Sequence, residues 1–367
     1  MSGQVVADAK TANSAEAPRV AAAALATFIK RAFEAAGLRS EDADVVANLM
    51  VEADLRGSDT HGVIRLPLYL RRLKAGGIKA RPDIRIVRER PATALVDGDN
   101  GIGHLVMRFA TMTAIEKAKG AGVGWVGARM SNHAGPAALY AMMPLAHDMI
   151  GIYSVVASAN HMAVWGGAET LLGTNPLAVA IPAGAEAPVV LDIATTVASY
   201  GTVKNYRLQG KQMPEGWMVS SRDGRAITDP ERSPEGLLLP IGGYKGSGLA
   251  LVLGLLAGTL NGASFGRDVV DFNADEKSAG DTGHFIVALD IDRFTPLAAF
   301  TAEVDRHLRD LRASRTLPGF DAIRLPGAER RRRRADRAAN GAPLAPELLL
   351  QLDRLAVELG LAPVRER

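Results

Sequence analysis

The chain of 367 residues contains no cysteine. Disulfide bonds, a thiolate nucleophile and thiolate zinc ligands are therefore excluded. Long apolar runs are missing as well. The longest, residues 248–260, is shorter than the roughly 18–20 residues that cross a bilayer, so it indicates a buried helix. A strong excess of one charge is also absent, because the formal net charge is only +3. We therefore predict no membrane partner and no nucleic-acid partner.

The N-terminal stretch MSGQVVADAKTANSAEAP lacks the charged start and the apolar core of a secretory signal. We expect residues 1–18 to form a disordered arm and the protein to be cytoplasmic. Apolar residues make up 47% of the chain and charged residues 23%. That balance is typical of a globular protein, and the length suffices for two compact domains.

Apolar residues at helical spacing mark both ends of the chain. Three helices are predicted near the N-terminus, the second of them capped by Ser40, over residues 20–37, 40–55 and 66–75. After residue 296 the pattern is again helical and charged. We therefore predict one helical domain built from residues 19–82 and 296–367.

The middle of the chain alternates between strand and helix patterns. Short apolar runs bounded by glycine, proline and aspartate indicate strands, at residues 93–96, 123–126, 150–156, 177–181, 189–191 and 285–289. Helical stretches lie between them, at residues 106–119 and 247–260. The alternation predicts an α/β domain over residues 83–295.

Two glycine-rich stretches imitate nucleotide-binding motifs. Gly122 to Gly127 has the spacing G-x-G-x-x-G, but it follows a predicted helix and overlaps a predicted strand. A dinucleotide fingerprint needs the strand first and the helix second, so we interpret the stretch as a helix stop. Gly242 to Gly248 carries Lys245 directly before an apolar helix. This second stretch either binds a phosphate or cofactor or forms a simple tight turn.

His61 lies in the polar, glycine-flanked stretch RGSDTHG between two predicted helices, and Arg65 follows four residues later. If the chain is helical from about Thr60, Arg65 lies one turn from His61 on the same face. A histidine exchanges a proton with a carbonyl or alkoxide near neutral pH, and an arginine binds a carboxylate through paired hydrogen bonds. The pair suits a 2-oxo acid. The alternative is that both residues cap the start of a helix.

Other polar positions are less informative. His133 follows a predicted strand, where a turn often contacts ligands, although the same stretch SNHAG also fits a plain helix cap. Thr174 lies in a turn before a proline and offers a hydroxyl to a ligand. No H-E-x-x-H cluster and no G-x-S-x-G motif occurs, so we predict no metal site and no serine hydrolase.

Several of these stretches carry family motifs. On them the chain resembles the malate/L-lactate dehydrogenase family of non-Rossmann NAD(P)-dependent oxidoreductases, which includes sulfolactate and ureidoglycolate dehydrogenases, 2,3-diketogulonate reductase and cyclic imino-acid reductases. The matching stretches run in family order over most of residues 20–340, at residues 53–78, 126–137, 165–182, 191–203, 239–253 and 282–294. The resemblance implies a mixed-sheet, non-Rossmann NAD(P)-binding α/β domain plus a helical domain, and a homodimer.

The resemblance also assigns roles to residues. His61 matches the family's catalytic proton donor, and Arg65 matches an arginine that binds the substrate carboxylate. Thr60 stands where the family usually has a serine whose hydroxyl assists the histidine, and Thr174 matches a substrate-side hydroxyl. Positions that match cofactor contacts are His133, Ala134, Gly135, Asp192, Ile193, Ala194, Tyr244, Lys245, Gly327 and Glu329. The last two belong to a late Pro-Gly-Glu motif, which here reads Pro-Gly-Ala-Glu.

We therefore predict an enzyme that transfers a hydride between NAD(P)H and the C2 carbonyl of a small 2-oxo acid, with NAD slightly preferred over NADP. One alternative is a cyclic imino-acid reductase that uses the same hydride step, although that branch has an aspartate where this chain has Thr202. An alternative of another class is an anion- or nucleic-acid-binding protein that uses arginines 330–334. That run is otherwise typical of a solvated helix face.

Overall fold

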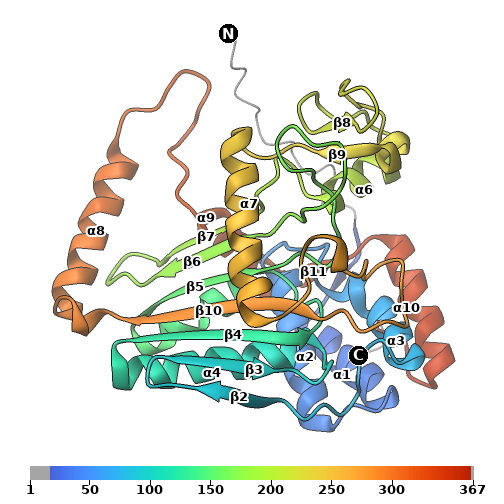
Figure 1. Ribbon diagram of the computed structural model, residues 1–367, viewed down its shortest axis with the longest axis horizontal. Helices are drawn as coiled ribbons and strands as arrows, with labels where there is room; N and C mark the ends of the chain where they lie inside the picture. Colours follow the sequence, from blue (N-terminus) through green and yellow to red (C-terminus); the bar gives the residue numbers. More distant parts are fainter. Residues whose placement is uncertain (1–16, 365–367) are drawn as a thin grey trace.

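The computed structural model describes residues 17–364, so the predicted N-terminal arm lies outside the described residues except for its last two positions. A mixed seven-stranded sheet forms the centre of the molecule (Figure 1). All neighbouring strands are antiparallel except β3 and β4. The strand order is β2 (Arg85–Glu89), β3 (Thr93–Asp97), β4 (Val123–Ser131), β10 (Thr282–Asp290), β5 (Met149–Val155), β6 (Leu177–Ile181) and β7 (Val189–Ile193). The predicted mixed α/β fold is confirmed.

Helices cover both faces of this sheet. One face packs against α4 (Gly103–Ala121) and the short α5 (Ala138–Ala141). A β-carbon on Gly124 would lie 2.0 Å from a carbonyl oxygen of α4, so glycine permits the close approach of helix and strand. The other face packs against α7 (Tyr244–Ala257), which runs across the strands (Figure 1). Because β10 is covered on both faces, its first seven residues are all buried.

A second core joins helices from both ends of the chain. It contains buried side chains of α1 (Ala22–Ala35), α2 (Ser40–Leu55), α3 (Leu66–Ala75) and α10 (Pro346–Leu359). A two-stranded pairing of β1 (Arg19–Val20) with β11 (Ala342–Pro343) ties the ends together. The long α9 (Ala328–Asn340) packs against α2.

The helix α8 (Leu297–Ala313) does not lie where the sequence analysis grouped it. It stands on the opposite side of the molecule from α1, α3 and α10 (Figure 1). Its Asp305 accepts hydrogen bonds from the backbone N–H groups of residues 184–186, in the turn between β6 and β7. Those backbone donors hold the helix at the sheet edge, which no local pattern indicates. The domain boundaries themselves remain a prediction.

A small lobe completes the fold. It consists of α6 (Tyr200–Leu208), β8 (Met218–Ser220) and β9 (Gly236–Leu238) around its own apolar cluster. Short 3₁₀ helices connect the larger elements, namely η1 (Val63–Arg65), η2 (Met143–His147), η3 (Pro230–Glu235), η4 (Thr259–Asn261), η5 (Gly266–Asp268) and η6 (Ile291–Arg293). No helix within residues 17–364 is long and apolar enough to span a membrane.

The local predictions meet different outcomes. The helix over 66–75 and the strand over 177–181 have the predicted bounds. Gly122 ends α4 in a left-handed conformation directly before β4, which confirms the helix stop. Ser40 is wrong as a cap, because it is the first residue of α2 and its hydroxyl donates to Glu34 instead. Lys245 is not in a loop before the helix but in the first turn of α7.

Candidate active site

Seven of the predicted site residues line one small cavity of about 130 Å³. The walls come from the turn after α2, the turn after β4, the segment after β5, and the start of α6. The seven residues are Thr60, His61, Arg65, His133, Ala134, Gly135 and Thr174. The sequence analysis therefore identified a set of residues that the fold brings together.

Asp54, near the end of α2, supports the turn that carries His61. This carboxylate accepts a hydrogen bond of 2.8 Å from the backbone N–H of Val63. A β-carbon on Gly62 would lie 1.9 Å from the Asp54 carboxylate, so glycine is required at this close approach. Burial raises the pKa of Asp54 to about 8. The turn therefore rests on a buried carboxyl group whose ordinary ionisation is suppressed.

Thr60 and Arg65 complete the same turn. The Thr60 hydroxyl lies 2.8 Å from His61 Nδ1, and its methyl group faces Gly201, where a β-carbon would lie 2.9 Å away. The chain is not helical from Thr60, as the spacing argument supposed, because η1 begins only at Val63. Arg65 instead reaches back, and its Nε donates to the Thr60 carbonyl over 2.8 Å.

Arg65 brings an unneutralised positive charge to the cavity. One of its terminal N–H groups donates to the side chain of Asn273 over 2.8 Å. No carboxylate in the described part of the chain forms an ion pair with it. A guanidinium has five N–H donors, so several remain available to an anionic ligand. The cavity is therefore suited to a carboxylate.

A second histidine stacks on the first. The rings of His61 and His133 lie 5.4 Å apart and nearly parallel. The Tyr69 hydroxyl lies 2.5 Å from His133 Nδ1, and the Gly135 N–H also points at this nitrogen. A backbone N–H can only donate, and the Tyr69 hydroxyl, whose pKa burial raises, keeps its proton and donates to the same nitrogen. His133 Nδ1 is therefore the acceptor, and Nε2 carries the proton of the neutral ring.

Both histidines are held neutral. Burial, followed by the charges of Arg65 and Arg330, lowers the pKa of His61 to about 3. Burial and Arg65 lower the pKa of His133 well below its ordinary value. An anionic ligand beside Arg65 would oppose the effect of the arginine charges. In the free protein His61 is therefore a proton acceptor.

A second cavity, of about 430 Å³, gathers four more predicted residues: Asp192, Ile193, Gly327 and Glu329. It lies between the end of β7 and the start of α9. The Asp192 carboxylate accepts from the Ala138 N–H over 3.3 Å, which connects this cavity to the turn that follows His133. Ala194 follows directly after β7. Residues 133–138 thus link the two cavities, because the start of this segment lines the first and its end contacts a residue that lines the second.

Tyr244 and Lys245 are placed differently. Both lie in the first turn of α7 and are exposed, Tyr244 by 64%. They line neither of the two cavities. Their assignment as cofactor contacts remains a prediction. Metal ligation has no geometric support among residues 17–364, where no three His, Asp or Glu side chains gather as ligands.

Comparison with known proteins identifies the family of the chain. The profile of the malate/L-lactate dehydrogenase family matches residues 20–353. The chain belongs to this family. Malate dehydrogenase of Pyrococcus horikoshii is 39% identical over 345 residues, which cover 92% of this chain and 94% of that protein. L-sulfolactate dehydrogenase of Methanocaldococcus jannaschii is 38% identical over 89% of this chain and 92% of its own.

Solved structures of the malate/L-lactate dehydrogenase family share the fold. The Pyrococcus horikoshii malate dehydrogenase superposes with a TM-score of 0.87 over 95% of this chain and 97% of that one, at 35% identity. Δ1-piperideine-2-carboxylate reductase of Pseudomonas syringae reaches 0.80 over 92% of this chain and 100% of its own, at 28% identity.

The names of two relatives state which cofactor each uses. Ureidoglycolate dehydrogenase (NAD(+)) of Escherichia coli O157:H7 is 31% identical over 85% of this chain and 88% of its own. (2R)-3-sulfolactate dehydrogenase (NADP(+)) of Chromohalobacter salexigens is also 31% identical, over 85% of this chain and 90% of its own. Similarity alone therefore leaves both nicotinamide cofactors open.

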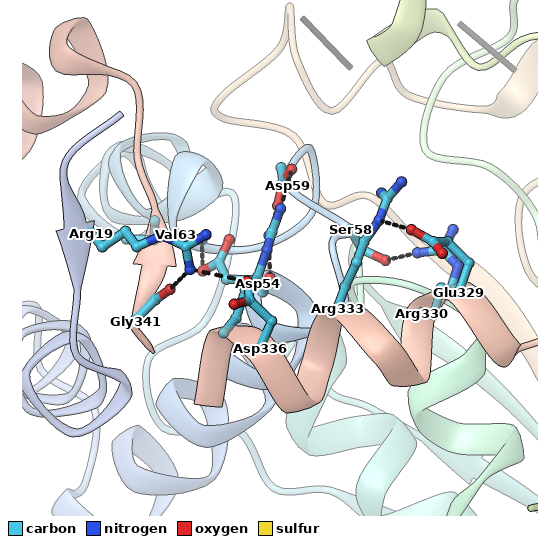
Figure 2. Close-up of polar contacts among 11 residues, drawn as sticks. Arg19, Asp54, Ser58, Asp59, Val63, Glu329, Arg330, Arg333, Asp336 and Gly341 are labelled. Atoms are coloured by element: carbon cyan, nitrogen blue, oxygen red, sulfur yellow. Dashed lines mark hydrogen bonds and ion pairs between the residues drawn. The ribbon is translucent and has the colours of Figure 1, made fainter. Parts of the chain in front are cut away.

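Sequence reasoning missed three residues of the site. Tyr69 has the spacing of a core residue on α3, and Asn273 is separated from Arg65 by 208 positions. The third is Arg330, because the arginine run is not simply a solvated helix face. One face of α9 contacts α2 and the turn region of His61. Arg330 donates to Ser58 (Figure 2), Arg337 to Asp59, and Arg334 to Glu52 on α2. The helical spacing of these arginines was the available signal.

Proposed function

We propose that the protein is an NAD(P)-dependent oxidoreductase that interconverts a small 2-hydroxy acid and its 2-oxo acid. The observation that carries the proposal is the pairing of His61 with the unneutralised Arg65 in one small cavity. A 2-oxo acid presents a carboxylate next to a carbonyl, and this cavity offers a carboxylate-binding fork next to a proton-exchanging ring. The family's malate and sulfolactate dehydrogenases support the same substrate class.

Arg65 binds the substrate carboxylate and thereby orients C2 toward the cofactor. His61 exchanges the proton of the C2 oxygen. Its lowered pKa makes it the acceptor when the hydroxy acid is oxidised. In the reducing direction, the bound carboxylate offsets the charge of Arg65 and so raises the pKa of His61, which favours the protonated ring that gives its proton to the new alkoxide. Thr60 holds His61 through Nδ1, and Thr174 offers a hydroxyl to the substrate.

A nicotinamide dinucleotide, when bound, supplies or takes up the hydride. The turn of His133, Ala134 and Gly135 would hold its nicotinamide end, with the N–H of His133 Nε2 available as a donor. Asp192, Ile193, Ala194, Gly327 and Glu329 would hold the remainder. The fit rests on two features, the connection between the cavities and the backbone N–H groups of Glu329 and Arg330 in the first turn of α9, which have no acceptor within the described residues. Tyr244 and Lys245, which line neither cavity, would contact the dinucleotide from α7.

The proposal is tested by a panel of 2-oxo acids assayed with NADH and with NADPH. Pyruvate, oxaloacetate and sulfopyruvate cover the substrate range, and their methyl esters serve as controls that lack the carboxylate. We expect oxidation of the reduced cofactor with the free acids and a large loss with the esters. NADH is expected to be used somewhat better than NADPH. Oxidation of neither cofactor with any free acid would contradict the proposal.

A cyclic imino-acid reductase is the second candidate. The structural similarity to Δ1-piperideine-2-carboxylate reductase favours it, because the same carboxylate-binding arginine suits a cyclic imine. Thr202 argues against it, because the imino-acid branch has an aspartate at this position. Here the Thr202 N–H donates to the Ser199 hydroxyl that caps α6, and the side chain offers no carboxylate. Adding Δ1-piperideine-2-carboxylate to the panel separates the two, and we expect slower turnover with it than with the best 2-oxo acid. We also expect a homodimer in light scattering.

A further inference from the structure

Arg330 links the second cavity to the turn that carries His61. It lies in the first turn of α9 and lines the second cavity. Its terminal N–H donates to the Ser58 hydroxyl over 2.5 Å (Figure 2). Ser58 is 8% exposed, and its carbonyl accepts from the backbone N–H of His61 over 2.8 Å. One side chain therefore contacts both the cavity for the dinucleotide and the turn that carries the proton-exchanging histidine.

Three other arginines of the run differ from Arg330, because carboxylates form ion pairs with them. Arg332 and Arg333 form ion pairs with Glu329, and Arg334 forms one with Glu52. Within residues 17–364, no carboxylate lies within ion-pair distance of Arg330, and its charge only partly offsets the burial that raises the pKa of Asp192 in the same cavity. Its hydroxyl partner uses one of five N–H donors. A partly buried guanidinium with unused donors at a cavity wall is suited to an oxyanion, and its fork matches a phosphate.

Resting on the proposed function, we infer that Arg330 binds a phosphate group of the dinucleotide and, through Ser58, holds the His61 turn in its working position. The N–H groups at the start of α9 support the same anion. Two phosphates have the required chemistry. One is the diphosphate bridge common to both dinucleotides, and the other is the ribose 2′-phosphate of NADP.

Binding is measured first, on full-length Arg330→Gln, with Arg331→Gln as the matched control. Arg331 is the adjacent arginine, is exposed, and lines neither cavity. Fluorescence titration gives dissociation constants for NADH, NADPH, ADP and adenosine 2′,5′-bisphosphate. We expect Arg330→Gln to weaken binding on the order of tenfold to a hundredfold, the range for a charge-assisted hydrogen bond. The control should bind like the wild type.

The pattern across the probes identifies the phosphate. Weaker binding of NADH, NADPH and ADP together supports the diphosphate bridge. Weaker binding of only NADPH and adenosine 2′,5′-bisphosphate supports the 2′-phosphate. Unchanged dissociation constants for all four probes would overturn the phosphate assignment. Arg330→Lys keeps the charge without the fork, so it should recover part of the lost affinity and provides a second variant if the glutamine protein is unstable.

Turn positioning is measured separately, at saturating cofactor. Ser58→Ala keeps the Arg330 charge but removes its contact, so we expect lower turnover with an unchanged dissociation constant. Arg330→Gln removes one of the charges that disfavour protonated His61. The charged and titratable groups around that ring are Arg65 on η1, Arg330 on α9, His133 after β4 and His104 on α4.

Oxidation of the hydroxy acid needs neutral His61. Because Arg330→Gln removes a charge that lowers the pKa of His61, the fall of kcat/KM in acid should begin at a higher pH in this variant than in the wild type. Arg330→Lys should restore the wild-type profile. Wild-type turnover in Ser58→Ala, together with a wild-type pH profile in Arg330→Gln, would overturn the positioning role. These outcomes differ from failure of the proposed function. That failure would appear as a wild-type protein that binds the dinucleotide but turns over no hydroxy or oxo acid.

Discussion

His61 and His284 are two histidines whose pKa burial lowers to about 3, yet their surroundings differ. His284 lies on β10, is fully buried, and has a partner on each nitrogen, the Tyr153 hydroxyl at 2.8 Å and the Ser131 hydroxyl at 3.0 Å. His61 keeps a partly exposed edge on the cavity and has a hydroxyl partner only on Nδ1. The lowered pKa therefore reflects burial in both residues. Within residues 17–364, only His61 of the two has a ring nitrogen, Nε2, without a hydroxyl partner in a cavity that Arg65 also lines, and this difference indicates the functional site.

The largest expected effect comes from exchanging each histidine for asparagine. His61→Asn should lower turnover by roughly 10²–10⁴-fold, the usual contribution of one general acid or base, with little change in cofactor affinity. His284→Asn should instead destabilise the fold by about 1–3 kcal/mol, because it leaves buried hydroxyls unpaired. Steady-state kinetics and urea unfolding of both variants measure this. Comparable losses of turnover in the two variants would contradict a catalytic role that is specific to His61.

Next in size is the effect of the neighbouring arginine. Arg65→Lys should raise KM for the oxo acid on the order of tenfold or more, because an ammonium cannot form the paired bonds of the guanidinium. Methyl esters of the substrate should lose activity in the wild type and lose little further in the variant. If the two losses multiply, Arg65 does not bind the carboxylate.

The pH dependence separates the histidines again. Both have pKa values below the ordinary 6.5, so each contributes stability above that pH, and the contribution falls as the pH drops toward about 3. Acid unfolding should therefore become less steep in either asparagine variant. Only His61 should also govern the acid side of kcat/KM for hydroxy-acid oxidation, which we expect well below pH 6.5. An acid limit near the ordinary value would contradict the low pKa of His61 in the free protein.

The smallest effects come from the hydroxyl partners. Thr60→Ala removes the group on His61 Nδ1, and we expect a loss of turnover of about tenfold or less, since the ring is reoriented but retained. Ser131→Ala removes the partner of His284 Nε2 and should cost about 1 kcal/mol of stability without changing turnover. Thermal unfolding together with kinetics checks the pair. Equal kinetic effects would mean that neither hydroxyl is specific to the site.

Periodicity predicted the elements better than the caps and the side-chain environments. The bounds of α3 and β6 follow from apolar spacing because burial on one face imposes that spacing. Ser40 and Lys245 were misplaced by a few positions, because helix ends depend on which backbone groups find partners outside the helix. The sequence analysis grouped α8 with the chain ends because its pattern is helical and charged. Its true position depends on hydrogen bonds from the turn between β6 and β7, which no local pattern reveals.

For the site, the sequence by itself determined the chemistry of the His61 turn and the family to which that turn belongs. Thr60, His61 and Arg65 are near neighbours in the chain, so their spacing already indicated a common function. Only the tertiary structure decided which groups complete the site. Arg330 meets Ser58 across 272 positions, and Asn273 meets Arg65 across 208. Such contacts depend on how whole helices pack. Local apolar spacing indicates that one face of an element is buried, but it does not indicate which other element covers that face.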